Sequence, residues 1–230
     1  MIKIKGMINK MKCTSTKLKY LSRNSKLLYP SFDITLNECQ KSCNYFVSKL
    51  CYAKNNPRIM IYNKPKNLRN EALLNSKSFV STIKKEILLS NSRKIRFFSA
   101  GDIYKISHLE KIERLCLALP NIQFWLSTHN EFLLSEFYKQ DKKPVKNLNI
   151  ILSNSEPNTE WELFLKKYWN KKRIATSSTT NEKSLSNCHS SVEKSSCDLC
   201  EKCFTGENIT YFIHGTYAEM RLKRYEDSKE

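Results

Sequence analysis

The hydrophobic and polar positions of the chain follow two periods that alternate along its length. Short apolar, partly alternating segments predict strands at 32–36, 94–98, 122–128, 148–153 and 173–177. Between them, apolar residues at helical spacing predict helices at 68–89, 107–119, 131–139 and 160–169. The segment 68–89 is long enough for one helix or for two.

This alternation of strand and helix is typical of an α/β fold with parallel strands and helical crossovers. The chain has 230 residues, which is short for a closed eight-fold barrel. We therefore expect a partial (β/α) barrel over 24–177, with a basic N-terminal arm at 1–23. Residues 178–230 are expected to form a linker, poor in apolar residues, and then a C-terminal cysteine-rich metal box.

The first cysteine group falls just after the first predicted strand. Cys39, Cys43 and Cys51 have the spacing C-x3-C-x7-C, and loop backbone at a strand end is free to bring their thiolates together. Three thiolates hold a 4Fe-4S cluster and leave one iron open for a substrate or cofactor. A closed structural zinc site normally takes a fourth ligand.

The second cysteine group lies near the C-terminus. Cys188, Cys197, Cys200 and Cys203 have the spacing C-x8-C-x2-C-x2-C, which predicts a fully ligated metal group. An auxiliary 4Fe-4S cluster and a zinc ion both remain open, although a four-cysteine zinc site usually shows two separated C-x2-C pairs. Three plus four cysteines match one open and one closed cluster.

Charge and export signals set the surroundings of these cysteines. The 40 basic and 22 acidic residues give a net charge of +18, which attracts nucleic acid; a lysine-rich surface from biased codon usage is the alternative. We see no signal peptide and no apolar run near the roughly 18 residues of a membrane span. We therefore expect a cytoplasmic protein, no membrane partner, and reduced thiols that bind metal instead of forming disulfides.

Polar residues follow the other predicted strands, where parallel α/β folds gather their chemistry. Gly101 and Asp102 follow the second strand, Ser127 and Thr128 end the third, and Ser153 ends the fourth. We predict that these five residues bind a cofactor. Their ordinary alternative is helix capping, in particular for Asp102, Ser127 and Thr128. His129 in the next turn is interpreted as structural.

An ordered set of motifs gives the chain a family resemblance. The set comprises N-S-K-L at 24–27, C-Y-A-K at 51–54, R-F-F-S-A-G-D at 96–102, F-W-L-S-T at 124–128, and Y-F-I-H-G at 211–215 after the cysteine box. In this order the chain resembles the phage gene product 88 proteins over about 24–215. The resemblance implies a phage- or plasmid-encoded protein acting in a bacterial host.

The layout is also similar to that of radical S-adenosylmethionine (SAM) domains. That resemblance implies that Cys39, Cys43 and Cys51 hold the open cluster, and that Gly101 and Asp102 lie near the SAM amino group. The chain departs from the common C-x3-C-x2-C spacing, and the aromatic Tyr52 follows the last cysteine instead of preceding it.

Two functions follow as expectations. The first is a radical SAM-type iron–sulfur enzyme that acts on nucleic acid or a nucleotide and needs an electron donor. The alternative is a non-catalytic nucleic-acid-binding protein stapled by zinc or a cluster. The substrate and the oligomeric state are not encoded in any motif that we identify.

Overall fold

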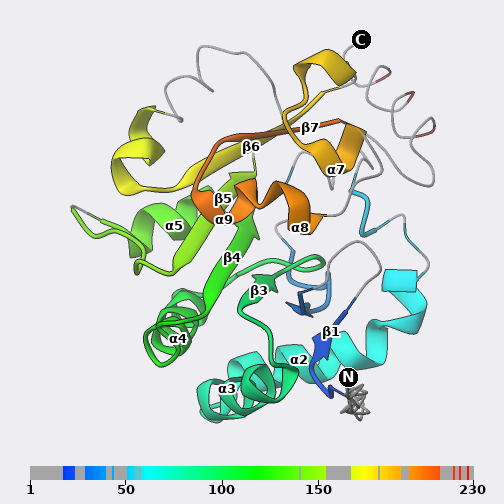
Figure 1. Ribbon diagram of the computed structural model, residues 1–230. Helices are drawn as coiled ribbons and strands as arrows, with labels where there is room; N and C mark the ends of the chain where they lie inside the picture. The colour runs from blue at the N-terminus through cyan, green and yellow to red at the C-terminus, as the bar shows by residue number, and fades with distance from the viewer. Residues whose placement is uncertain are drawn as a thin grey trace, which may run out of the picture.

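The structure is a computed structural model that describes residues 18–23, 29–39, 43, 51–54, 56, 58–139, 141–153, 167–180, 182–192, 197–212, 220, 223 and 227. Within these residues the centre of the molecule is one seven-stranded sheet (Figure 1). Its strands are β1 (Leu21–Ser22), β2 (Ser31–Phe32), β3 (Lys94–Phe97), β4 (Gln123–Thr128), β5 (Leu148–Ser153), β6 (Ala175–Thr180) and β7 (Ile209–Phe212).

Helices fill most of the connections between these strands. The chain forms the π-helix η1 (Arg58–Tyr62), α2 (Lys64–Asn75), α3 (Phe79–Ser90), α4 (Ile106–Leu117), α5 (Glu131–Phe137), the 3₁₀ turn η2 (Lys183–Leu185), α7 (His189–Val192), α8 (Cys197–Cys200) and α9 (Lys202–Thr205). A further helical stretch covers 167–172. In the described part of the chain, no helix is long and apolar enough to cross a membrane.

The strands lie in the sheet in the same order as in the sequence. β2 to β7 are all parallel to their neighbours, and only β1 runs antiparallel, beside β2. Each crossover therefore moves the chain one strand further in the same direction, without the reversal of a doubly wound sheet. Among the described residues the sheet is open, with β1 and β7 at its edges.

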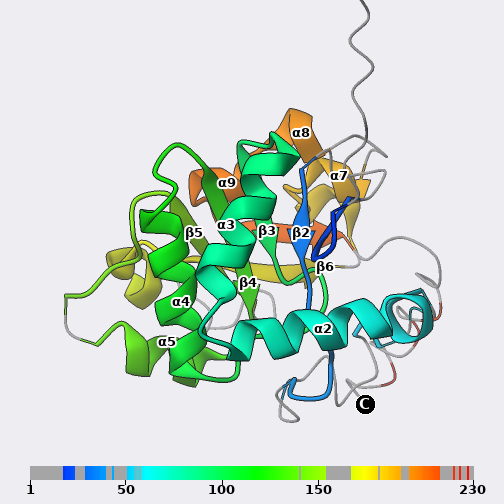
Figure 2. The same cartoon turned by 90° about the horizontal axis from the view of Figure 1, so that it is seen from below.

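The two faces of the sheet are covered differently. Alternate strand residues, such as Phe97 and Phe124, pack with helices α2–α5 in the main hydrophobic core. The intervening residues, such as Trp125 and Ile151, contact Phe204 of α9 in a second, smaller core. Figure 2 shows α2–α5 along the first face, and Figure 1 shows α8 and α9 beside β4 and β5.

We call this second side of the sheet the cysteine face, because α8 and α9 carry cysteines against it. By the strand register, its residues include Arg96, Trp125, Ser127, Ile151, Ser153, Ser177 and Tyr211.

The helices on the first face form because their apolar residues share one side. Phe79, Ile83 and Ile87 recur every four residues along α3 and are fully buried. Asn91 ends that helix in the left-handed conformation, with a φ of 52°, a backbone shape that asparagine tolerates. The same spacing places one side of α4 against α3 and the sheet.

The predicted elements agree with this fold in kind. The α/β class is confirmed, and strands coincide with the predicted segments 94–98, 122–128, 148–153 and 173–177. The predicted strand at 32–36 is wrong beyond its first residue, because β2 ends at Phe32. The segment 68–89 forms two helices separated at 76–78. β6 continues to Thr180, so the strand extends three residues into the predicted linker, and β7 adds a strand from the C-terminal segment. The basic arm predicted at 1–23 is described only over 18–23, where Leu21–Ser22 forms β1 as part of the sheet. Residues 1–17 and the first part of the predicted helix 160–169 lie outside the described residues.

Candidate functional site

Asp33 joins the carboxyl ends of β2 and β3. Its Oδ1 accepts hydrogen bonds from the backbone N–H groups of Ser99 at 2.6 Å and Ala100 at 3.2 Å. Its Oδ2 accepts a third from the Ser31 hydroxyl at 3.1 Å. The buried carboxylate therefore fixes the turn that leads from β3 to Gly101.

Gly101 lies where this turn passes closest to the chain after β2. Its φ of 83° falls in the region that favours glycine. A Cβ atom at this position would lie 2.8 Å from the carbonyl oxygen of Thr35 and 2.9 Å from that of Ile34. The structure thus gives Gly101 a packing role, and its predicted contact with a cofactor stays a prediction.

Asp102 links the end of β3 to the end of β4 by hydrogen bonds. Its Oδ1 accepts from the backbone N–H of Ile103 at 2.7 Å and from the Thr128 hydroxyl at 2.5 Å, and its Oδ2 accepts from the backbone N–H of His129 at 2.8 Å. Burial raises the pKa of Asp102 to about 6, and these hydrogen bonds oppose the rise. A carboxylate has about four acceptor positions, so three donors leave room for one more.

The first cysteine group lies beside this carboxylate. The pKa of Cys39 is raised above its usual range, first by burial and then by the nearby Asp102, Cys51 and Cys43. Residues 40–42 and 44–50, between these cysteines in the sequence, lie outside the described residues. Cys39 is therefore in electrostatic range of Asp102 at the end of the neighbouring strand, and of Cys51 and Cys43.

Three serines form a hydrogen-bonded row on the cysteine face. The hydroxyl oxygens of Ser127 in β4 and Ser153 in β5 are 3.0 Å apart, and Ser177 in β6 donates to Ser153 at 3.2 Å. The sequence prediction named the first two and missed Ser177, although it has the same alternating position in its strand. Thr128 lies on the other side of β4, where it holds Asp102.

His129 is neutral at pH 7. Burial lowers its pKa to about 4, and a hydrogen bond with the backbone of Ser153 partly opposes this. At this position the imidazole links the ends of β4 and β5. This agrees with the interpretation of His129 as a structural turn residue.

The second cysteine group is held on the cysteine face by contacts that need no metal. Phe204 of α9 packs edge-on against Trp125, with ring centroids 6.1 Å apart. The Asn149 side-chain amide donates to the carbonyl oxygen of Phe204, and Lys94 forms an ion pair with Glu201. β3, β4 and β5 therefore all anchor the segment that carries the cysteines.

Cys188 is within electrostatic range of the other three thiols of this group. Burial raises the pKa of Cys203 to about 12, with smaller rises from Cys188 and Cys197. Burial also raises the pKa of Cys188, with smaller contributions from Cys197 and Cys200. Without a cation to replace the proton, these two sulfurs remain neutral thiols at pH 7.

The cysteines fit a soft metal by their chemistry but are not arranged as a ready-made site. The eight described cysteines carry thiols and form no disulfides. Within the described ranges, no three His, Cys, Asp or Glu side chains are already close enough to hold a metal ion. Cys39, Cys43 and Cys51 lie outside the described helices and strands.

Arg96 of β3 connects the two cysteine groups, and the sequence prediction missed it. Its guanidinium carbon lies 4.3 Å from the centroid of the Trp125 ring. It forms a hydrogen bond with Tyr52, and its charge also acts on Tyr211, whose hydroxyl lies 3.7 Å from the Cys203 sulfur. A charged residue inside a parallel strand is unusual, because such strands are covered on both faces. The charge of Arg96 within an apolar strand is the sequence signal that would have identified it.

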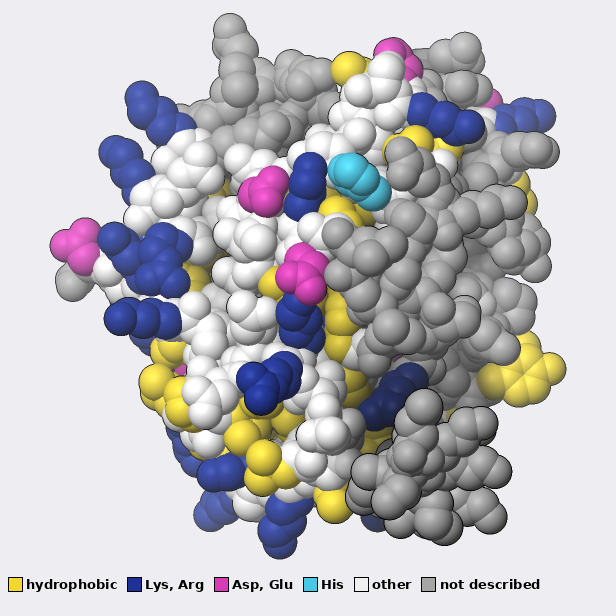
Figure 3. All heavy atoms as spheres, viewed as in Figure 1, with side chains coloured by type: hydrophobic (Ala, Val, Ile, Leu, Met, Phe, Trp, Pro, Cys, Tyr) yellow, Lys and Arg dark blue, Asp and Glu magenta, His cyan; other side chains and the backbone are white. Residues whose placement is uncertain are grey.

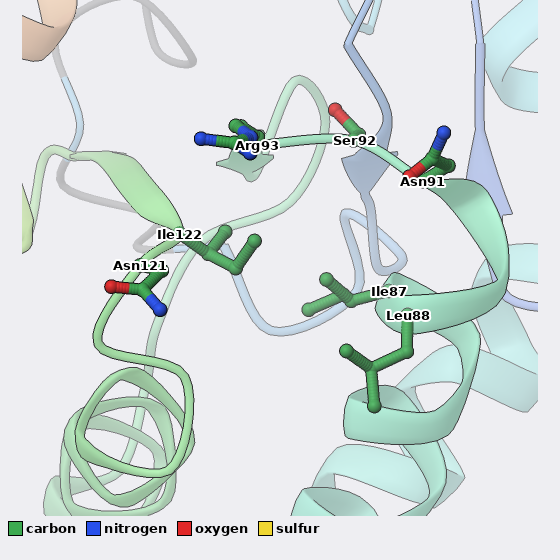
Figure 4. A pocket seen from close by; sticks show the side chains of 7 residues that line it. All are labelled: Ile87, Leu88, Asn91, Ser92, Arg93, Asn121 and Ile122. Carbon is green, nitrogen blue, oxygen red and sulfur yellow. The ribbon is translucent and has the colours of Figure 1, made fainter.

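A separate pocket of about 370 Å³ lies at the amino ends of β3 and β4, away from the strand ends that carry Asp33 and Asp102 (Figure 4). It is lined by Ile87, Leu88, Asn91, Ser92, Arg93, Asn121 and Ile122. This lining contains no cysteine, histidine or carboxylate. The pocket therefore takes no part in the cysteine site.

Over the described residues, the chain is an α/β protein with an open, sequentially ordered, mostly parallel sheet. One cysteine group follows the carboxyl end of β2, and the other lies on the cysteine face. A model of the gene product 88 family matches residues 5–217, so the chain belongs to that family. No curated protein and no solved structure matches it.

Proposed function

We propose that this protein is an iron–sulfur protein of the radical SAM type. One observation carries the proposal: Cys39 follows β2 and lies in electrostatic range of Cys43, Cys51 and the β3-end residue Asp102. Three thiols and a carboxylate are the groups that a cluster with a bound cofactor would require. Six parallel strands in sequential order are also consistent with a partial barrel.

In this proposal the chain binds and orients the reactants. Cys39, Cys43 and Cys51 would hold the open cluster, and Asp102 has acceptor capacity left for the SAM amino group. Gly101, Ser127, Thr128 and Ser153 would form the surrounding wall. A cluster held there would supply one-electron reducing chemistry to the bound SAM, and the chain would supply binding and orientation.

The second cysteine group would hold an auxiliary cluster. Cys188, Cys197, Cys200 and Cys203 provide four thiolates, enough to close a cluster without an open position. An external electron donor would supply the reducing equivalents. A nucleic acid or nucleotide substrate is consistent with the net charge of +18.

The test is metal and sulfide analysis of protein purified without oxygen, with electron paramagnetic resonance spectra recorded with and without SAM. We expect iron and sulfide for two clusters, and a spectrum that changes when SAM is added. Cys51→Ala should lose the SAM-sensitive signal and keep the second cluster. Cys116→Ala is the matched control, because Cys116 is a fully buried core residue on α4. A SAM-sensitive signal that survives in Cys51→Ala contradicts the assignment.

A second candidate is a nucleic-acid-binding protein stapled by zinc. Figure 3 favours it, because Lys and Arg side chains line the left and lower rims of the molecule with few acidic groups among them. In that case the same analysis gives zinc without sulfide, and spectra that ignore SAM. The cysteines would then stabilise the fold, and the basic rim would bind the phosphate backbone.

A further inference from the structure

Three buried polar groups near the carboxyl end of β3 have no hydrogen-bond partner. They are Nε of Arg96, the hydroxyl of Ser99 and Nε1 of Trp125, whose side chain is only 4% exposed. Among the described residues, six buried side-chain nitrogen or oxygen atoms lack a partner, and these three are half of them. Such a concentration in one place requires a specific explanation, because native interiors pair their buried polar groups.

The three groups belong to one neighbourhood. Arg96 and Trp125 are register partners on β3 and β4, and the guanidinium lies on the indole ring at 4.3 Å. Ser99 is three residues beyond Arg96, and its backbone N–H donates to Asp33, whose charge acts on Arg96. All three groups can donate a hydrogen bond, and two of them can only donate. Among the described residues, no acceptor pairs with these three donors.

The nearby acid does not fill this role. Asp33 accepts hydrogen bonds from the Ser31 hydroxyl and from the backbone of Ser99 and Ala100. Nε of Arg96, Nε1 of Trp125 and the Ser99 hydroxyl are not among its donors. Asp33 therefore balances part of the Arg96 charge but leaves the Nε of Arg96 unpaired. The other groups whose charge acts on Arg96 are Tyr52, Tyr211 and Cys203.

We propose that Arg96, Ser99 and Trp125 bind an anionic oxygen group, a carboxylate or a phosphate, carried by a small-molecule ligand on the cysteine face. A planar guanidinium matches either group with two parallel hydrogen bonds. The indole and the hydroxyl supply further donors, and the serine row that begins at Ser127 continues the polar surface across β5 and β6. This inference goes beyond the proposed iron–sulfur function and needs no metal.

The experiment follows the indole N–H signals of the ¹⁵N-labelled, full-length protein. Inorganic phosphate and succinate are titrated separately against sodium chloride at the same ionic strength. The chloride arm removes the general attraction of anions to a basic chain. The Trp125 signal, assigned with Trp125→Phe, should shift and saturate with one of the two anions, and that anion identifies the ligand group. If neither anion shifts the Trp125 signal beyond the chloride arm, the proposal is overturned.

Two variants separate this site from non-specific charge. Arg96→Met should weaken the binding about 10- to 100-fold, the usual effect of losing hydrogen bonds to a charged group. Arg93→Met removes the same charge from an exposed position at the amino end of β3 and should leave the affinity unchanged within about twofold. Equal losses in both variants would mean binding by net charge alone and would overturn the proposal.

Arg96→Lys covers the case in which the methionine variant does not fold. It keeps the positive charge but loses the fork of donors and the stacking on Trp125, so binding should weaken by an intermediate factor. Wild-type affinity in a folded Arg96→Lys protein would contradict the proposed role of the guanidinium.

Discussion

At the scale of single residues, Asp102 combines burial with three accepted hydrogen bonds. Its side chain is only 5% exposed, and its carboxylate accepts from two backbone N–H groups and the Thr128 hydroxyl. Burial is the stronger influence, because the pKa is raised to about 6 despite these donors. The charged form is therefore held in place at some cost in stability.

This cost gives a pH dependence with a defined sign. The pKa of Asp102 is raised from 3.8 to about 6 in the folded protein, so the folded state binds the proton more tightly between these values. Stability from this group is present below about pH 4 and is lost as the pH rises through 6, a difference of about 3 kcal/mol. Asp102→Asn cannot titrate, so its free energy of unfolding should lack this decline.

The measurement is urea unfolding of wild type and Asp102→Asn from pH 4 to pH 7. The stability of the wild type relative to the variant should fall across this range. Asp141→Asn, at an exposed position, is the matched control and should follow the wild type. A difference between wild type and Asp102→Asn that is constant with pH would show that Asp102 does not titrate in this range.

Sequence reasoning identified the thiols and the strand-end polar residues but missed the residues that join them. The spacing of cysteines and a polar residue that follows an apolar segment can both be read from the local sequence. The link from Arg96 to Tyr52 and Tyr211 depends on strand order and register, which bring residues far apart in the sequence onto one face. For the same reason the orphaned donor of Trp125 has no signature in the sequence.

At the scale of elements, the ends of β2 and β3 form the most constrained junction near the first cysteine group. Gly101 and Gly206 both have a positive φ, at 83° and 79°. They differ in what a side chain would meet. A Cβ at Gly101 would press on the backbone of Ile34 and Thr35, whereas a Cβ at Gly206 would lie 3.7 Å from Oδ1 of Asn149, an ordinary van der Waals distance.

This pair of glycines separates steric contact from backbone strain. Gly206→Ala should destabilise the protein by about 1 kcal/mol, the cost of a left-handed conformation for alanine. Gly101→Ala should cost about 2–4 kcal/mol, because a clash with backbone adds to the same strain. Denaturant unfolding of both variants gives the difference. Equal costs would mean that the turn after β3 moves freely away from β2.

Local periodicity predicted the parallel core better than its edges. β4 and β5 coincide with predicted strands because their apolar residues form continuous runs. β6 has the sequence A-T-S-S-T-T, whose polar character hides the strand beyond Ser177. Polar groups of this strand form hydrogen bonds with residues from distant segments. Asn208, for example, accepts hydrogen bonds from the backbone N–H and the hydroxyl of Thr176. Such pairing cannot be read from a short window of sequence.

At the scale of the whole molecule, the helices on the first face expose basic side chains, while part of their acidic residues is buried. Lys85 on α3 and Arg114 on α4 are exposed there, whereas the acidic residues Glu86 and Glu113 of the same helices are buried. Burial of these acids leaves the outer surface more positive than composition alone suggests. The cysteine face lies on the other side of the sheet, so this basic surface is separate from the candidate site.

This arrangement predicts nucleic-acid binding with a steep salt dependence. If the basic helices bind about six phosphates, affinity for duplex DNA or RNA should fall about 10³-fold between 50 and 200 mM salt, because bound lysines release counterions. Neutralising Lys84 and Lys85 on α3 together, as Lys84→Gln with Lys85→Gln, should lower the slope of log affinity against log salt by about one for each phosphate that the lysines no longer neutralise. Fluorescence anisotropy at several salt concentrations measures both quantities.

Lys139→Gln is the matched control, because Lys139 already forms an ion pair with Glu136 at 2.8 Å and should contribute little to the slope. A flat salt dependence would mean that the charge of +18 serves solubility, and the search for a substrate would then turn to small molecules that fit the cysteine face.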